Sequence, residues 1–168
     1  MIAMALMCDP KLILADEPTT ALDVTIQAQV LELLKELSRR LRVAMIIITH
    51  NLGVVARYAD RVNVMYAGKV IESGKSQDIY HCTRHPYTLG LLHSVPRLDE
   101  PRPAKLEPIS GQPPDLIQLP SGCSFRPRCN FADARCGSEA PPLRDCGGGH
   151  WYACWRAERL DIADGQRR

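Results

Sequence analysis

Two adjacent acids, Asp16 and Glu17, follow a run of aliphatic residues in the stretch LILADEPTTALD (Leu12–Asp23). In open α/β sheets, ligands collect beyond the carboxyl ends of the strands, so a strand over 12–15 would carry both acids to such a site. Carboxylates suit Mg²⁺, and a carboxylate beside a phosphate can orient and deprotonate an attacking water. The pattern therefore indicates phosphate hydrolysis, with Asp16 binding Mg²⁺ and Glu17 acting on water. The competing interpretation is that Asp16 only caps a turn before Pro18.

The last third of the chain carries a second set of residues suited to chemistry, namely the five cysteines Cys123, Cys129, Cys136, Cys146 and Cys154. Soft sulfur ligands select iron–sulfur clusters or zinc, and the nearby Arg126, Arg128 and Arg135 would stabilise thiolates. The spacing leaves open a [4Fe–4S] cluster, tetrahedral zinc and a set of reduced structural cysteines. The gaps are wider than the paired C-x₂-C of a zinc ribbon, which favours the cluster.

The other two cysteines lie far from this set in the sequence. Cys8 and Cys82 are expected to be packing residues, because free cysteines are often buried as small hydrophobic side chains. His81 and His85 flank Cys82, and we expect both to be solvated in a helical connector. Neither pair is predicted to bind a metal.

The elements that must position the two acids follow from the apolar pattern. Residues 12–15 and 44–49 are apolar runs typical of parallel strands covered on both faces. A helix over 25–40 is predicted between them, with an apolar stripe made by Ile26, Val30, Leu33, Leu37 and Leu41. Further along, the pattern predicts a helix over 52–58, an antiparallel hairpin of 62–66 with 69–72, and helices over 76–81 and 86–94.

This order of elements predicts an α/β fold with a parallel sheet and helices. We expect three parts along the chain: residues 1–95 as an α/β domain, residues 96–120 as a proline-rich linker, and residues 121–168 as an irregular cysteine-rich extension.

Composition narrows the class of protein. The chain has 168 residues, 45% hydrophobic and 24% charged, and a net charge of +2 with acids and bases interspersed, so no strong field points to nucleic acid or a membrane surface. No segment approaches the roughly 20 apolar residues that span a bilayer. Met1–Met7 lacks the basic flank of a signal peptide, so we expect a soluble, intracellular protein with reduced cysteines.

Three elements in order resemble the ABC-type ATPases. Leu14–Thr19 (LADEPT) resembles the Walker B motif, the following ALD ending at Asp23 resembles the D-loop, and His50 after ITH matches the switch histidine. The resemblance implies that Asp16 binds Mg²⁺–ATP, that His50 contacts the γ-phosphate, and that Asp23 acts across a dimer interface where each ATP lies between two subunits.

Other parts of a nucleotide site are not found in the sequence. A phosphate loop of the form G-x-x-x-x-G-K-[ST], the Q-loop glutamine segment and the LSGGQ-type signature are absent, and Gly147–Gly149 is no substitute. We therefore expect this polypeptide alone to be inactive, as a fragment of a longer ATPase that begins just after the signature or, less favoured, as a split subunit. Exposed sheet edges, exposed apolar helix faces and marginal stability would follow.

The cysteine-rich tail resembles the C-terminal extension of oligopeptide/dipeptide transporter ATPases. In that family four cysteines can ligate an iron–sulfur cluster, which the resemblance carries over to Cys123, Cys129, Cys136 and Cys154; Cys146 is then a bystander or replaces Cys154. The implied function is the ATP-hydrolysing subunit of a peptide importer at the cytoplasmic face of the cytoplasmic membrane. Its partners would be a second ATPase subunit, two membrane-spanning permease subunits and an extracytoplasmic peptide-binding protein, with no nucleic acid.

Two other functions compete with this one. A DNA-repair ATPase of the ABC superfamily also combines a Walker B motif with metal-bound cysteines, but Asp23 and the lack of a basic stripe with interleaved aromatics disfavour it. A non-catalytic module, in which an iron–sulfur or zinc site serves assembly or redox sensing, is the second alternative.

Overall fold

The structure, a computed structural model, describes residue 4 and residues 6–20, 22–94 and 109–160. The chain divides into two compact units, Met1–Ala59 and Asp60–Arg168, which are described separately below. This division falls inside the first predicted part. The predicted boundaries at 95 and 120 stay predictions, and residues 95–108 of the expected linker lie outside the described part of the chain. The described remainder, residues 109–120, forms neither helix nor strand.

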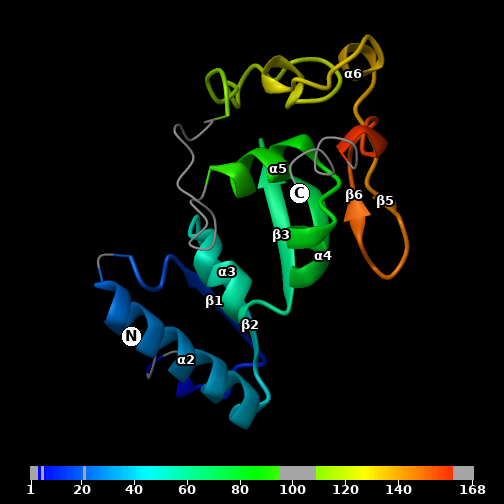
Figure 1. The fold of residues 1–168 in the computed structure, drawn as a ribbon. Helices are drawn as coiled ribbons and strands as arrows, with labels where there is room; N and C mark the ends of the chain where they lie inside the picture. The colour runs from blue at the N-terminus through cyan, green and yellow to red at the C-terminus, as the bar shows by residue number, and fades with distance from the viewer. Residues whose placement is uncertain (1–3, 5, 21, 95–108, 161–168) are drawn as a thin grey trace, which may run out of the picture. The chain divides into compact units, whose positions relative to one another are not determined.

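The first unit is built on two parallel strands. Strand β1 (Leu12–Asp16) pairs with β2 (Ala44–Ile48) in a register that runs from Leu12↔Ala44 to Asp16↔Ile48. Helix α2 (Val24–Leu41) connects the two strands, and α3 (Leu52–Tyr58) follows β2 (Figure 1). The predicted order of strand, helix, strand and helix and the parallel pairing are confirmed. The carboxyl ends of β1 and β2 therefore lie at the same edge.

Helices α2 and α3 both begin at a side-chain cap. Asp23 Oδ1 accepts hydrogen bonds from the N–H groups of Thr25 and Ile26, at 3.1 and 3.0 Å. Asn51 Oδ1 accepts from the N–H of Gly53 at 3.0 Å at the start of α3. These caps satisfy backbone donors that have no partner inside a helix, so they fix where each helix begins.

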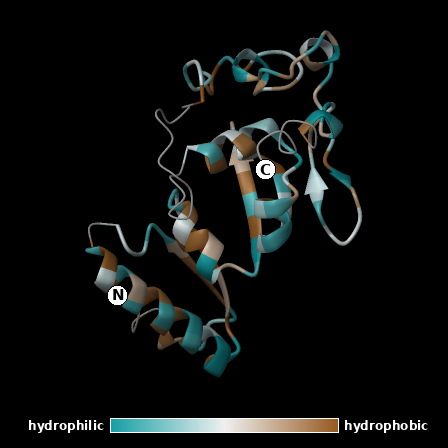
Figure 2. Ribbon diagram, viewed as in Figure 1, coloured by the Kyte–Doolittle hydropathy of each residue, from teal (hydrophilic) through white to brown (hydrophobic). Residues whose placement is uncertain are grey.

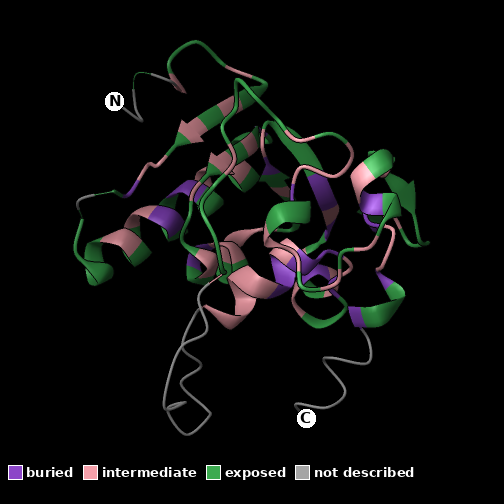
Figure 3. Ribbon diagram, turned by 90° about the horizontal axis from the view of Figure 1, so that it is seen from above, coloured by how far each residue is buried: buried purple, intermediate pink, exposed green. Residues whose placement is uncertain are grey.

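The expectation that both strands are covered on both faces is wrong for this structure. Exposure alternates along β1 and β2, and the outward side chains are 48–66% exposed: Leu12, Leu14, Ile46 and Ile48. The predicted stripe on α2 is also rotated, because Leu31 and Leu34 are its buried residues while Leu33 is 49% exposed. An apolar run shows which residues can be buried, but the elements that pack against it decide which of them are buried. Figure 2 shows the hydrophobic residues of the first unit's strands, and Figure 3 shows that exposed and intermediate residues alternate along them.

The second unit is an antiparallel sheet of order β3-β4-β6-β5. Strands β3 (Arg61–Tyr66) and β4 (Lys69–Lys75) form the predicted hairpin. Its two turn residues, Ala67 and Gly68, both have positive φ (48° and 75°), as a type I′ turn requires. Strand β6 (Trp151–Tyr152) pairs with β4, and β5 (Arg144–Asp145) pairs with β6.

The expectation of an irregular tail therefore needs correction. Most of the described tail has no regular structure, but two of its segments extend the hairpin into a four-stranded sheet. Strands of two residues carry no readable period, so the sequence could not predict them. The short helices are α4 (Ser76–His81), α5 (Pro86–His93), the 3₁₀ turn η1 (Arg126–Arg128) and α6 (Arg135–Ser138). No helix in the described ranges is long and apolar enough to cross a membrane.

The core of the second unit joins the hairpin to the tail. Tyr66, Ile71 and Phe125 are its buried centre. The rings of Tyr66 and Phe125 meet edge to face with centroids 5.2 Å apart, and Tyr87 of α5 lies 5.5 Å from Phe125. Such aromatic pairs add roughly 0.5–1.5 kcal/mol beyond their buried area. The tail is thus part of the core of this unit.

Replacing Asp23 by Ala removes the cap of α2. We expect the free energy of unfolding of the first unit to fall by about 1 kcal/mol, because two backbone N–H groups lose their acceptor. Urea unfolding followed by far-ultraviolet circular dichroism measures this change. The control is Asp23→Asn, which keeps the capping oxygen and should stay close to the parent chain. Equal stability of the Ala variant and the parent would contradict the capping role.

Candidate functional site

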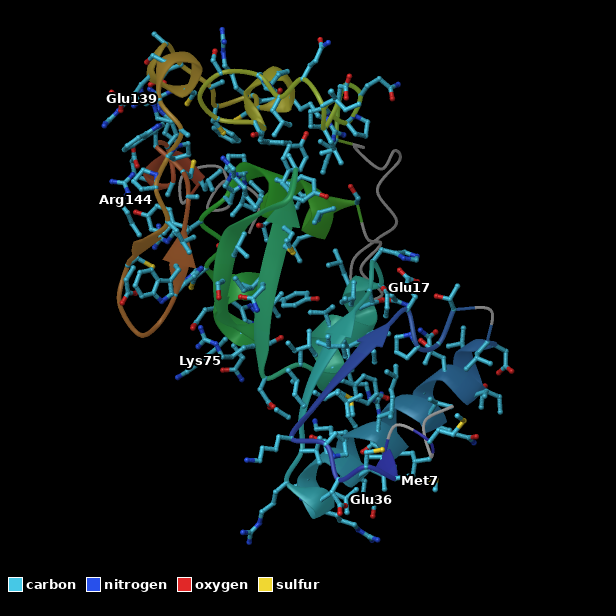
Figure 4. The ribbon with its side chains drawn as sticks, turned by 180° about the vertical axis from the view of Figure 1, so that it is seen from behind. Met7, Glu17, Glu36, Lys75, Glu139 and Arg144 are labelled. Carbon is cyan, nitrogen blue, oxygen red and sulfur yellow. The ribbon has the colours of Figure 1, made fainter. Side chains whose placement is uncertain are left out.

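The first candidate site lies where β1 and β2 end. Glu17 follows β1, and its N–H donates to the carbonyl of Ile48 at 2.9 Å, which continues the pairing by one residue. Its φ of 47° is in the left-handed region, so the chain turns sharply there. His50 Nδ1 lies 2.6 Å from Glu17 Oε1. The structure therefore brings together two of the residues predicted from the sequence; Figure 4 labels Glu17 at the end of β1.

The carboxylate of Glu17 is held at both oxygens. The Thr20 hydroxyl donates to Oε2, and His50 contacts Oε1. These two contacts, Thr20 first and His50 second, lower the pKa of Glu17 below its usual range. Glu17 is therefore ionised at neutral pH.

The other two predicted residues lie on either side of the same turn. Asp16 is the exposed last residue of β1, one position before Glu17. Asp23 is occupied as the cap of α2. Between them, buried Thr19 accepts a hydrogen bond from Gln27 Nε2 at 2.9 Å, which fixes the turn against the helix. Asp16 and Asp23 therefore flank the turn that carries Glu17.

The second candidate site is a pocket in the second unit, lined by all four cysteines that the family resemblance selects. Its other lining residues are mainly apolar or aromatic, with three cationic or basic side chains. The full lining is Cys123, Cys129, Cys136, Cys154, His85, Pro86, Phe125, Phe131, Ala132, Pro141, Trp155, Arg126 and Arg156. Cys146 does not line this pocket. It is exposed, and its thiol donates to the carbonyl of His150 at 3.2 Å.

Three of the four cysteines are placed by one local loop. Cys123 N–H donates to the carbonyl of Cys136 at 2.9 Å, and Cys129 N–H donates to that of Arg126 at 3.2 Å. Asp133 Oδ1 accepts from Cys136 N–H at 3.1 Å. Gly122 allows the close approach, because a Cβ there would clash with the Cys136 carbonyl oxygen. The fourth cysteine, Cys154, comes from beyond β6.

Burial makes three of the four thiols harder to ionise. Burial raises the pKa of Cys129 to about 11 and that of Cys154 to about 12, and it raises the pKa of Cys136 as well. The chemistry of the donor set fits a soft metal or an iron–sulfur cluster, which would displace the thiol protons on binding. Among the described residues, however, no three or more His, Cys, Asp or Glu side chains stand in a metal-holding arrangement.

Two expectations about the remaining cysteines and histidines are wrong. Cys8 and Cys82 are exposed and are not packing residues. His81 is exposed as expected, but His85 is 1% exposed and lines the pocket. His85 Nδ1 accepts from Tyr87 N–H at 3.1 Å as the cap of α5, and burial lowers its pKa to about 3. The signal missed was the sequence His85-Pro86, a capping residue followed by a proline at the first helical position.

Sequence reasoning also missed other residues around both sites. Thr20 contacts Glu17 at the normal spacing of a turn, which gives no sequence signal of its own. Trp155 lines the pocket and stacks with two arginines, the Arg135 guanidinium 3.5 Å from its ring centroid and the Arg144 guanidinium 4.7 Å from it. Of the three arginines expected to stabilise thiolates, only Arg126 lines the pocket.

Known proteins are similar to this chain over most of its length. Residues 71–136 match the family model described as the oligopeptide/dipeptide transporter, C-terminal region. An oligopeptide transport ATP-binding protein of Salmonella typhimurium is 54% identical over 93% of this chain and 46% of its own length. A dipeptide transport ATP-binding protein of Bacillus subtilis is 55% identical over 92% of this chain and 46% of its own length.

A solved structure, cbiO1 from Clostridium perfringens, described as part of the ABC transporter complex cbiONQ, is similar with a TM-score of 0.45. The two are 35% identical, and the match covers 49% of this chain and 33% of that one.

These sequence matches define the chain as a relative of transport ATP-binding proteins. It belongs with those of the oligopeptide/dipeptide transporter family, as its motifs predicted. The chain spans about half the length of the curated relatives it matches. Both the Salmonella and the Bacillus relative are transport proteins by description, which gives the DNA-repair alternative no support.

The buried imidazole of His85 makes the stability of the second unit depend on pH. Its pKa is about 3 in the folded chain against 6.5 when exposed, so below pH 6.5 only the unfolded chain takes up the proton. We expect the free energy of unfolding to fall by about 2 kcal/mol more between about pH 7 and pH 5 than in the variant His85→Gln.

Urea unfolding at several pH values, followed by tryptophan fluorescence, measures this difference. The matched control is His81→Gln, because His81 is exposed and its replacement should leave the pH dependence unchanged. The same pH dependence in the His85 variant and the parent chain would show that His85 is not buried as a neutral side chain.

Proposed function

We propose that this chain forms part of the ATP-hydrolysing subunit of a peptide importer. The observation that carries the proposal is the contact between Glu17 and His50, 2.6 Å apart at the carboxyl ends of two parallel strands. Similarity to oligopeptide and dipeptide transport ATP-binding proteins supports the substrate class, peptides. The cofactors are ATP and Mg²⁺.

Each residue at this edge has a role in the proposal. Asp16 binds Mg²⁺, because its carboxylate ends β1 beside the turn. Glu17, held ionised by Thr20 and His50, orients the attacking water on the γ-phosphate side. His50, whose side chain is 84% exposed, is accessible to the γ-phosphate. Asp23 contributes across a dimer interface through the carboxylate oxygen that does not cap α2.

The proposal also includes where the protein works and with which partners. It acts at the cytoplasmic face of the cytoplasmic membrane, paired with a second ATPase subunit. Two membrane-spanning permease subunits and an extracytoplasmic peptide-binding protein complete the importer. The exposed apolar side chains of β1, β2 and α2 support burial against further protein in such an assembly.

Replacing Glu17 by Gln tests the assigned role. The chain lacks a phosphate loop, so the test uses a hybrid that joins it to the part of the Salmonella relative that it does not match. We expect ATP hydrolysis by the hybrid to fall by about 10²–10⁴-fold in Glu17→Gln, with Mg²⁺–ATP binding retained, because a neutral amide cannot take up the proton of the attacking water as a carboxylate can. Phosphate release and equilibrium binding measure the two properties.

The matched control is Glu32→Gln, an exposed glutamate on α2 away from the strand ends, which should keep full activity. The chain without the added part should show no hydrolysis above the Glu17→Gln level. Unchanged turnover in the Glu17 variant of an active hybrid would refute the role of Glu17. A hybrid that binds ATP but never hydrolyses it would count against the whole proposed function.

A second proposal concerns the cysteine pocket. Cys123, Cys129, Cys136 and Cys154 line one pocket, which supports a four-thiolate site for a [4Fe–4S] cluster or for zinc. When bound, a cluster would supply electron transfer and zinc would supply a structural cross-link. Arg126 and Arg156 would balance the negative charge of the thiolates. The alternative of a metal site that serves only assembly or redox sensing, without ATP hydrolysis, gains no support from the similar transport ATP-binding proteins.

Anaerobic purification followed by iron, sulfide and zinc assays tests the metal site. About four iron and four sulfide per chain is expected for the cluster, and about one zinc for the structural site. Cys136→Ser should lower the metal content strongly, because Cys136 lies in the pocket, while the control Cys82→Ser should leave it unchanged. Absence of metal from the parent chain after anaerobic purification would contradict the proposal.

A further inference from the structure

The second unit contains a buried carboxylate that neither proposed site uses. Glu72 lies on β4 and is 0% exposed, and His150, which precedes β6, is 5% exposed. His150 Nε2 lies 2.9 Å from Glu72 Oε1. A charged group in the protein interior costs free energy unless it is fully hydrogen-bonded, so a buried carboxylate retained here needs an explanation.

Glu72 also binds the connection between α4 and α5. Its Oε2 accepts from the Thr83 hydroxyl at 3.1 Å, and its Oε1 accepts from the Arg84 N–H at 2.5 Å. An ionised carboxylate can accept all three contacts, including the one from His150. His85, which follows Arg84 in the chain, lines the cysteine pocket. One side chain on β4 thus holds the segment that brings His85 to the pocket.

His150 holds the other end of the same arrangement. Strand β6 has only two residues, and its residue Tyr152 pairs with Glu72 of β4. Just after β6, the Ala153 N–H donates to the Ile71 carbonyl of β4 at 2.8 Å. The next residue is Cys154, which lines the pocket. The imidazole of His150 packs closely on β4 at Gly74, where an added Cβ would lie 3.1 Å from its Cδ2. Two backbone pairs alone fix register weakly, whereas a buried side-chain contact fixes it strongly.

We infer that Glu72 and His150 are positioning residues that place Cys154, the sequence-distant cysteine, in the pocket with the other three. The three cysteines of the local loop have their own backbone hydrogen bonds and do not need this contact. This inference rests on the proposed metal-binding function only for the reason why the four cysteines are gathered in one pocket. Its geometry stands on the described contacts alone.

The test measures how fast individual cysteines react with N-ethylmaleimide in the full chain, reduced and freed of metal with a chelator. Peptide mass spectrometry reports each cysteine separately. In His150→Leu, Glu72 loses a buried partner, and we expect Cys154 labelling to accelerate at least about fivefold. Cys136 should keep its slow rate because the local loop is intact. His150→Gln, which retains an N–H donor, should restore much of the protection.

Gly74→Ala is a second, milder variant that keeps both members of the pair. The new methyl group crowds the His150 ring, so Cys154 should react faster with N-ethylmaleimide than in the parent chain. The labelling rate of Cys136 should again stay unchanged. His81→Gln and Glu158→Gln are matched controls on exposed residues and should change neither rate. Cys82, which is exposed, serves as the reference for reagent activity.

Two results would overturn the inference. The first is an unchanged rate for Cys154 in both His150→Leu and Gly74→Ala. The second is equal acceleration of Cys154 and Cys136 in these variants, because the pair would then stabilise the whole unit and not the position of one cysteine. Since no metal is present, these outcomes are independent of the metal assays. No metal in the parent chain after anaerobic purification, together with selective acceleration of Cys154 in the variants, would refute the metal proposal and support this one.

Discussion

Parallel pairing of β1 with β2 is the constraint on which the candidate ATP site depends. Glu17 and His50 are distant in the sequence, yet they meet at 2.6 Å because parallel strands end at the same edge of a sheet. Helix α2 makes this pairing possible by returning the chain to the start of β2, and the Asp23 cap fixes where that helix begins. The site is therefore a product of strand direction and helix length as much as of its own residues.

The cysteine pocket depends on a different constraint, the docking of the tail on the hairpin. Phe125 packs with Tyr66 in the core, and β6 pairs with β4, so the tail is a structural part of the second unit. Three cysteines come from a compact loop, while Cys154 arrives by way of the sheet. Burial raises the pKa of Cys129, Cys136 and Cys154, so metal binding at this pocket would be coupled to proton release.

Periodic and directional features of the fold were predictable from the sequence. The helices, the parallel strands and the hairpin follow from apolar spacing and turn residues, and the strand ends placed Glu17 and His50 together. Exposure of Leu14, the two-residue strand β6 and the burial of His85 were not predictable in this way. Each depends on which surfaces pack together, and local sequence carries no record of that choice.

The proposed function requires Glu17 and His50 to act together in one ATP site. A double-mutant cycle on hydrolysis by the hybrid protein, with Glu17→Gln, His50→Ala and the two combined, tests it most directly. Residues that act as a unit are non-additive, so the double variant should lose little more activity than the worse single variant. Fully additive losses, with each residue contributing the same whether or not the other is present, would contradict the account.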